Sequence, residues 1–508
     1  MELNFKKAGH DYYEPLHFAP FTCETMRETI VPDSCGDIAR IVDTTGLVCL
    51  TNCELTGDGR FCASGSVEAS VLYIPEKEDG PRALHFQIPF QCYGEGQGPA
   101  DCEFLDIRGD LHSIDTRVLN PRKVLTRASL ILYPSGCRHA SLSVCTEMSD
   151  ESEGTIQLLQ EKKETRVVAG VREKEFTFSE ELPLSPGRGG AEEILSARFD
   201  VRGTDSKLIG NKLVVKGLIS ASVLYREGGG RLALLQQDLP FSQIIDGAGF
   251  DEECESEAAY RLLSAECQIG GESGSDDAYM LTVTLLLRAR VTVWRGEEVA
   301  FIADLYSTAA PVSCQMMEME LTEDAQKSTR RQNVRELLET GVPVKSVLDT
   351  EIGCGDVQIN GGEMKIAVWA RCLYLDENDV LGSARREFMV SGELPEGSPA
   401  AEGEAACHGD IITNITPEGI ELRFPLECTV SASNRRRYIC VSGGETTEEE
   451  QDREVMPSLI LRKLGKEETL WSVAKQYRTT CKGILEVNDL TEESQVPYDR
   501  LLLIPRTR

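Results

Sequence analysis

The sequence lacks any run of apolar residues long enough to cross a bilayer. Its longest apolar stretches, such as LTVTLLL, have the length of a strand, whereas a membrane-spanning helix needs roughly 20 consecutive apolar residues. The first residues, MELNFKKAGHDYYEPLHF, contain neither an apolar core nor a small-residue cleavage site, which together mark a secretory signal peptide. We therefore expect no transmembrane segment and a protein that is made and kept in the cytosol.

Sequence motifs for catalysis and metal binding are also missing. No segment has the form of a nucleophile elbow, a P-loop or an HExxH zinc site. The glycine-rich segments GEGQG and GRGGAEE lack the strand–turn–helix context that cradles phosphates, so they are more typical of loops. The six His residues are scattered and no CxxC pair occurs, so the ligand spacing of a zinc site is absent. The sequence thus predicts a non-enzymatic chain without a metal or cofactor.

Cysteine, in contrast, is abundant, with 18 residues. Disulfide frameworks belong to oxidising compartments, and the chain shows no export signal. We therefore interpret most of these cysteines as small buried apolar residues.

Positive charge is scarce in most of the chain, whose formal net charge is −31. Residues 458–508 hold nine Lys and Arg against seven Asp and Glu, a balance of +2, so residues 1–457 carry −33. A body this acidic repels phosphate backbones, which argues against nucleic acid as a partner.

One strand pattern occurs three times. The stretch ASVLY stands at residues 69–73 and again at 221–225, and ARCLY stands at 370–374. In each copy alternate residues are apolar and the last residue is Tyr, and alternation with period two is typical of a strand with one buried face. The third copy departs from the pattern because Arg371 stands where the other two copies have Ser.

Turn signals precede the three copies at equal distances. Gly59, Asn211 and Asn360 lie in turn-like segments, and each precedes the final Tyr of its copy by 14 residues. Such turns join antiparallel strands. The sequence therefore predicts a mainly β fold with three antiparallel β-sandwich or barrel-like modules in tandem. We expect the module boundaries to be 1–150, 151–312 and 313–441.

The order of these motifs resembles the SPOCS domain of clostridial and bacillar spore-coat proteins. The first copy has PDSCGDIARIV, SVLY, IPF and NPRKV, and the second has EEILSARFDV, SVLY and LPF. The third copy is the most divergent and has REFMV in place of the proline motif. The resemblance covers most of residues 1–435 and implies three SPOCS-like β domains in a spore-coat protein.

Two segments depart from the β pattern. The stretch RRQNVRELLET at 330–340 is the clearest helix candidate in the body. The stretch SGGETTEEEQDREVMP at 442–457 is acidic and nearly devoid of apolar side chains. Because such a segment cannot bury enough surface to order itself, we expect a linker there.

The last segment, residues 458–508, carries a different pattern in which short apolar runs bracket two helical stretches. Thr469 and Thr480 stand where the N-caps of the two helices are expected. Helical spacing assigns the buried positions to Leu470, Val473, Ala474, Tyr477, Ile484 and Leu485. The predicted order of elements is therefore β-α-α-β.

This segment resembles a LysM domain through the stretches ETLWSVAKQY, ILEVNDL and LLLIP. In many LysM domains, the loop before the first helix and the loop after the second form a groove for N-acetylglucosamine chains. The resemblance places candidate contacts at Gly465, Lys466, Glu467, Glu468, Thr469, Asn488, Asp489 and Leu490. Glu467-Glu468 replaces the common Gly-Asp and Asp499 replaces a common Gly, and these larger, charged side chains would crowd a neutral sugar groove.

Trp471 has two interpretations. It stands beside Leu470 in a small domain, where a Trp is usually mostly buried. It also lies about 100° from Leu470 around the helix axis and shares a face with Lys475 and Arg478. A partly exposed Trp beside two cations is a plausible interface anchor, so the sequence leaves both roles open.

Together the two resemblances imply a non-enzymatic scaffold or adaptor in assembly of the bacterial endospore envelope. The combination of SPOCS and LysM domains resembles a clostridial spore morphogenesis protein, which joins the coat basement layer built by the ATPase stage IV sporulation protein A. The resemblance implies a location on the forespore surface in the mother-cell cytosol. The implied partners are this ATPase, docked through the LysM-like domain, and other coat proteins. The alternative is a binder of peptidoglycan or N-acetylglucosamine that is attached to cortex or cell wall.

Overall fold

The computed structural model describes residues 2–77, 80–149, 155–184, 190–270, 280–360, 363–393, 401–446, 458–465, 468–492 and 501–505. This part of the chain is dominated by antiparallel β-strands, and its two short helices lie near the C-terminal end. The mainly β fold class predicted from the sequence is confirmed.

Three successive groups of strands follow one plan, and we call them modules. The first module contains β1 (Phe5–His17), β2 (Phe21–Ile30), β3 (Ile38–Leu55), β4 (Arg60–Pro75), β5 (Arg82–Gln97), β6 (Cys102–Asn120) and β7 (Lys123–Met148). The second contains β8 (Ile156–Pro183), β9 (Ala191–Ile209), β10 (Lys212–Glu227), β11 (Leu232–Asp246), β12 (Glu255–Ile269) and β13 (Met280–Ser307). The third contains β14 (Val312–Glu339), β15 (Val344–Asn360), β16 (Glu363–Asp376), β17 (Leu381–Glu393), β18 (Ala401–Ala406), β19 (Ile412–Thr416) and β20 (Gly419–Thr446).

Each module packs a three-stranded meander against a second layer built on one long strand. The meanders are β3-β4-β5, β9-β10-β11 and β15-β16-β17. The long strands are β7, β13 and β20, and each pairs with the strand or strands that open its module, namely β1 and β2, β8, and β14. The sandwich plan therefore recurs with the sequence repeat.

The repeated motif forms the central strand of every meander, namely β4, β10 and β16. Its alternating apolar residues point into the module core, as the period-two pattern predicted. Val67, Val71 and Tyr73 are fully buried in the first module, and Tyr225 and Tyr374 are 3% and 6% exposed in the other two.

The opposite face of the motif strand is buried as well where the three modules meet. Leu72, Leu224 and Leu373 precede the three Tyr residues and lie together in one apolar cluster. The meanders also contact one another in a ring, since β5 lies against β9, β11 against β15, and β17 against β3. The modules follow one another along the chain but close into a ring in space.

Arg371 lies at this junction and binds carboxylates from two modules. Its guanidinium donates to Asp43 of the first module, to Asp349 at 2.6 Å and to Glu351 at 3.0 Å. Arg198 of the second module binds both oxygens of Asp349, at 2.5 and 2.7 Å. The side chain of Arg371 is 5% exposed and that of Asp349 is fully buried. These two charges are therefore stabilised by their pairing and not by contact with water.

The network also sets the protonation of Asp349. Burial by itself raises the pKa of this carboxyl, but the attraction and hydrogen bonds of Arg198 and Arg371 outweigh burial. The pKa of Asp349 therefore lies well below its usual range, and the carboxylate stays charged in the folded protein.

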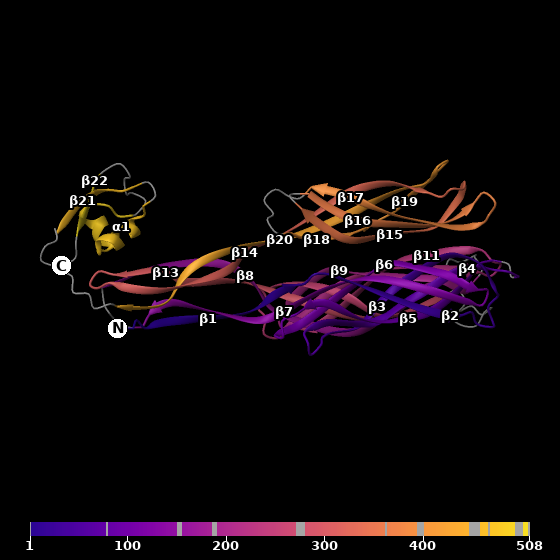
Figure 1. Cartoon of the computed structure of the whole chain (residues 1–508), viewed down its shortest axis with the longest axis horizontal. Helices are drawn as coiled ribbons and strands as arrows, with labels where there is room; N and C mark the ends of the chain where they lie inside the picture. The colour runs from indigo at the N-terminus through magenta and orange to yellow at the C-terminus, as the bar shows by residue number, and fades with distance from the viewer. Residues whose placement is uncertain are drawn as a thin grey trace.

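Beyond the sandwiches, the outer halves of the long strands form what we call the ribbon bundle. It consists of residues 5–17 with 135–148, 156–163 with 299–307, and 312–322 with 435–446. Figure 1 shows these ribbons extending side by side from the modules towards the N-terminus. Val144, Phe301 and Cys440, one from each module, share an apolar core there, and the Leu3 N–H donates to the Gly444 carbonyl at 2.9 Å. The start of the first module is thus tied to the end of the third.

The helix predicted over 330–340 is wrong, because residues 330–339 belong to strand β14. They pair with β20 from Gly419 to Cys428, and Val334 and Leu338 point towards the core of the third module. Tertiary pairing and alternating burial override the short helical spacing. The predicted linker also begins too early, since 442–446 continue β20, while 447–457 lie outside the described residues.

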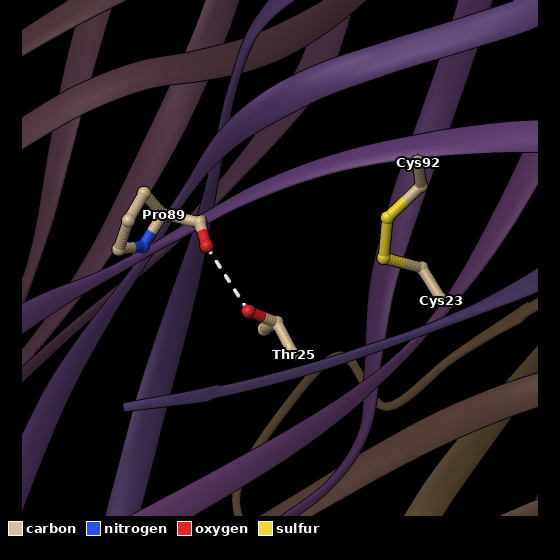
Figure 2. Close-up of a disulfide and its surroundings, with 4 residues drawn as sticks. All are labelled: Cys23, Thr25, Pro89 and Cys92. Atoms are coloured by element: carbon tan, nitrogen blue, oxygen red, sulfur yellow. Dashed lines mark hydrogen bonds between the residues drawn. A yellow bond between two sulfur atoms is a disulfide. The ribbon is translucent and has the colours of Figure 1, made fainter. Parts of the chain in front are cut away.

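One pair of cysteines departs from the expectation of free thiols. Cys23 on β2 and Cys92 on β5 form a disulfide across the two layers of the first module, with Cα atoms 5.9 Å apart (Figure 2). Nearby, the Thr25 hydroxyl donates to the Pro89 carbonyl at 3.0 Å. Of the other 16 cysteines, seven are buried and none is exposed, as expected for small apolar residues.

Arg371→Ala should lower the free energy of unfolding by about 3 to 5 kcal/mol, because it removes the cation that pairs with Asp43 and leaves Asp349 and Glu351 to Arg198 alone. Urea denaturation of the full chain measures this change. The matched control is Arg437→Ala, whose side chain is 72% exposed and whose loss should cost no more than about 0.5 kcal/mol. Equal effects of the two substitutions would contradict the role given to Arg371.

Lowering the pH should reduce the stabilisation that the Asp349 carboxylate gives to the folded protein. Because its folded-state pKa is depressed, the stability it supplies is full above the unfolded pKa near ~3.9 and is lost as the pH falls towards the folded value. The gap in unfolding free energy between wild type and Asp349→Asn should therefore narrow between about pH 5 and pH 3. Urea midpoints at several pH values test this, and a constant gap would argue against it.

Candidate functional site

The C-terminal domain contains β21 (Leu459–Lys463), α1 (Leu470–Tyr477), α2 (Cys481–Val487) and β22 (Leu501–Pro505). The two strands pair in antiparallel fashion, and the two helices lie between them in the chain. The predicted β-α-α-β order is confirmed.

Both helices begin at the residues expected from the sequence. The Thr469 hydroxyl accepts from the Ser472 N–H at 3.1 Å, and the Ser472 hydroxyl accepts from the Thr469 N–H at 3.1 Å. The Thr480 hydroxyl accepts from the Gly483 N–H at 2.9 Å. These caps satisfy N–H groups that have no partner within the helix. The helices then bury Leu470, Val473, Ala474 and Ile484.

The loop before α1 is closed by its own glutamate. One oxygen of Glu468 accepts from the Gly465 N–H at 2.9 Å, and the other pairs with Arg462 on β21. The Glu468 carboxylate therefore holds the loop together. Of the other candidate contacts in this loop, Thr469 caps α1, and Lys466 and Glu467 lie outside the described residues.

The loop after α2 is closed by Asn488. Its side-chain amide donates to the carbonyls of Ile484 at 2.7 Å and Leu503 at 2.6 Å, and its side-chain oxygen accepts from the Leu503 N–H at 2.8 Å. This candidate contact therefore ties α2 to β22. Of its neighbours, Asp489 is exposed with φ 56°, and Leu490 packs against the domain core.

Trp471 and Lys475 contact the body of the same chain. The indole N–H donates to Asp304 Oδ2 at 2.8 Å, and the Lys475 ammonium lies 2.6 and 2.8 Å from the two oxygens of Asp304. The Trp471 ring also packs edge-on against Tyr306, with centroids 4.8 Å apart. Trp471 is thus half-buried and acts as an anchor. Arg478, the third member of the predicted face, ends α1 as its C-cap with φ 51°.

Asp304 and Tyr306 are the contact residues that the sequence did not reveal. Both belong to the outer end of β13, and Tyr306 is only 5% exposed because it joins the core of the C-terminal domain. Its hydroxyl donates to the Thr479 carbonyl at 2.7 Å, and burial raises the pKa of Tyr306. The only signal in the sequence is an Asp inside the otherwise apolar stretch VAFIADLY.

A second surface of the C-terminal domain is apolar and open. Leu459, Leu461 and Leu501 are 49%, 61% and 64% exposed on one face of the β21-β22 sheet. The opposite face buries Leu502 and Ile504 in the domain core. Contiguous exposed apolar residues of this kind are typical of interaction sites.

A cavity of about 2800 Å³ lies between the three modules. Charged side chains of both signs line it, and several of them pair with one another, as in Arg108–Asp110 at 3.3 Å and Arg290–Asp106 at 3.9 Å. This pairing favours neither an anion nor a cation as ligand. Across the described ranges, no group of His, Cys, Asp and Glu is placed to hold a metal ion.

Comparison with known families finds two matches. The family model described as SipL, SPOCS domain, matches residues 191–269, which span β9 to β12 of the second module. The LysM domain model matches residues 464–505, within the C-terminal domain. No curated protein and no solved structure matches the chain.

Both matched domains are non-catalytic binding domains, and together they support a sporulation-related adaptor with a C-terminal domain of the peptidoglycan-binding type. The first and third modules repeat the strand plan of the matched second module. Among the helices that the structure describes, none has the length and apolar character needed to cross a membrane.

Asn488→Ala should loosen the C-terminal domain, because it leaves the Leu503 N–H without its acceptor at a cost of about 1 to 3 kcal/mol. We expect faster amide hydrogen exchange in β22 of the full chain, with the three modules unchanged. Glu486→Ala is the control, since its side chain is 66% exposed. Unaltered exchange in β22 would show that Asn488 does not hold this strand.

Proposed function

We propose that the chain is a non-enzymatic adaptor in assembly of the bacterial endospore coat. Its C-terminal domain docks the coat basement-layer ATPase, stage IV sporulation protein A, and its body contacts other coat proteins. The adaptor works at the forespore surface in the mother-cell cytosol. The SPOCS and LysM matches support the sporulation context.

The single observation that carries this proposal is the chemistry of the Trp471 face. The Trp471 indole and the Lys475 ammonium on this face contact the carboxylate of Asp304 and the ring of Tyr306, which lie on the surface of the body of the same chain. These groups belong to the kinds that dominate protein–protein interfaces. The apolar outer face of β21 and β22 offers a second contact area on the same small domain.

The candidate partner contacts in the C-terminal domain remain those expected from the sequence. They are Gly465, Lys466, Glu467, Glu468, Thr469, Trp471, Lys475, Arg478, Asn488, Asp489 and Leu490. We give Trp471, Lys475 and Arg478 the leading roles in docking, because Glu468 and Asn488 direct their side chains to contacts within the domain.

The mechanism is tethering. The ring of modules forms one interlocked body, and the C-terminal domain follows it in the chain after residues 447–457. A partner held by this domain is kept at high effective concentration near any partner of the body, without a new contact between the two.

The second candidate is a peptidoglycan binder, which the LysM match favours. Here the two loops around Gly465 and Asn488 would hold N-acetylglucosamine chains. A pull-down of the full chain with insoluble peptidoglycan, compared with a pull-down on the immobilised ATPase, discriminates the two functions. Retention by peptidoglycan alone would replace our proposal with this one.

The double charge swap Lys475→Glu/Arg478→Glu should weaken binding of the full chain to the ATPase at least about tenfold, as expected when charged contacts at an interface are reversed. Surface plasmon resonance measures the change. Lys482→Glu, on an 86% exposed side chain of α2, is the matched control and should bind as wild type does. Unchanged affinity in the double swap would remove this face from the proposal.

A further inference from the structure

The end of β13 enters the C-terminal domain with two side chains. Tyr306 fills a place in the domain core beside Leu470 and Trp471, and its hydroxyl reaches the Thr479 carbonyl. Asp304 lies on the rim, where Trp471 and Lys475 both bind its carboxylate. The contact therefore combines a buried aromatic anchor with a charge-assisted pair, as strong interface sites do.

A β-bulge aims these two side chains outwards. The pairing of β13 with β8 shifts between Ile302 and Asp304, so one extra residue is inserted there and the faces of the strand exchange. Ile302 and Leu305 consequently both point into the ribbon bundle, at 0% and 1% exposure. Asp304 and Tyr306, two residues apart, share the opposite face and meet the C-terminal domain.

The contact is separable from the core of the ribbon bundle. The apolar residues that hold this end of the bundle are Leu3, Cys145, Ile302, Leu305 and Val441. Asp304 and Tyr306 contribute their side chains to the neighbouring domain instead. Truncating them removes the contact while the ribbon core keeps its residues.

We propose that the C-terminal domain is a receptor for an extended segment that presents an acidic and an aromatic side chain two residues apart. The Asp-x-Tyr segment at 304–306 of the same chain occupies this receptor and closes it. A protein partner with the same acidic and aromatic chemistry binds by displacing the segment. Displacement of the internal segment by a partner rests on the proposed adaptor function, whereas the receptor itself does not.

The short connection to the body makes the closed state strong. Residues 447–457 join β20 to the C-terminal domain, and a short tether gives an intramolecular ligand an effective concentration of roughly millimolar. An external segment of equal intrinsic affinity must compete with that concentration. Its apparent affinity is the intrinsic affinity multiplied by the fraction of molecules in which the internal segment has left the receptor. Weakening the internal contact should therefore strengthen external binding.

The test uses a fluorescent peptide with the sequence of residues 299–308, VAFIADLYST, and the full chain. By fluorescence anisotropy, Asp304→Ala/Tyr306→Ala should bind this peptide at least tenfold more tightly than wild type does. Adding Trp471→Ala to that variant should abolish the gain. A peptide with Ala in place of its Asp and Tyr should bind none of the three proteins.

Each failure has a separate meaning. Equal affinity of wild type and Asp304→Ala/Tyr306→Ala would overturn the closed state, and failure of that variant to bind the peptide would overturn the receptor. Tyr306→Phe, which loses the hydrogen bond to Thr479 but keeps the ring, should give an intermediate gain. The same variants are then tested against the ATPase. Tighter ATPase binding by the opened variant supports displacement, whereas peptide binding without ATPase binding leaves the receptor intact and rejects the proposed partner.

Discussion

The buried pairing of Arg371 with Asp43, Asp349 and Glu351, shared with Arg198, is the interaction on which the architecture depends. A buried guanidinium requires carboxylates in well-defined positions, and here they come from the first and third modules while a second guanidinium comes from the second. Replacing one member leaves the others as costly unpaired charges. The three modules are therefore held in one relative arrangement rather than strung out along a flexible chain. Only one copy of the repeat has Arg at this position, and Arg371 lines the same small space as Leu72, Leu224 and Leu373.

Closure of the ring decides which surfaces remain for partners. The outer strands of each meander face the neighbouring modules, so these edges are covered and are protected from pairing with other chains. The ring also brings the long strands together as the ribbon bundle (Figure 1). The end of this bundle presents Asp304 and Tyr306 to the C-terminal domain. The second layers of the modules and the C-terminal domain therefore remain as the surfaces to which the adaptor proposal assigns partners.

The parts of the candidate site that were predictable are those governed by neighbours in the chain. Thr469 and Thr480 cap their helices because a cap needs only a hydroxyl three residues before an N–H. The shared face of Trp471 and Lys475 follows from helical spacing alone. In contrast, what this face binds could not be predicted, since Asp304 precedes Trp471 by 167 residues. The bulge that exposes Asp304 leaves no pattern in VAFIADLY beyond one acidic residue. The pairing of Cys23 with Cys92 was missed for a similar reason, because strand pairing and layer packing, not spacing, bring them together.

The sequence by itself determined the mainly β fold, the threefold repeat and the C-terminal β-α-α-β order, because alternation, turns and helix caps act over a few residues. It also singled out Arg371 as the departure from the repeat. Only the tertiary structure decided what that departure does, how the modules close and why residues 330–339 form a strand rather than a helix. These outcomes depend on which distant residues share a buried space, where the cost of an unpaired charge or an unpaired strand outweighs local preference. The occupation of the C-terminal domain by its own body was decided in the same way, by the meeting of β13 and α1 in space.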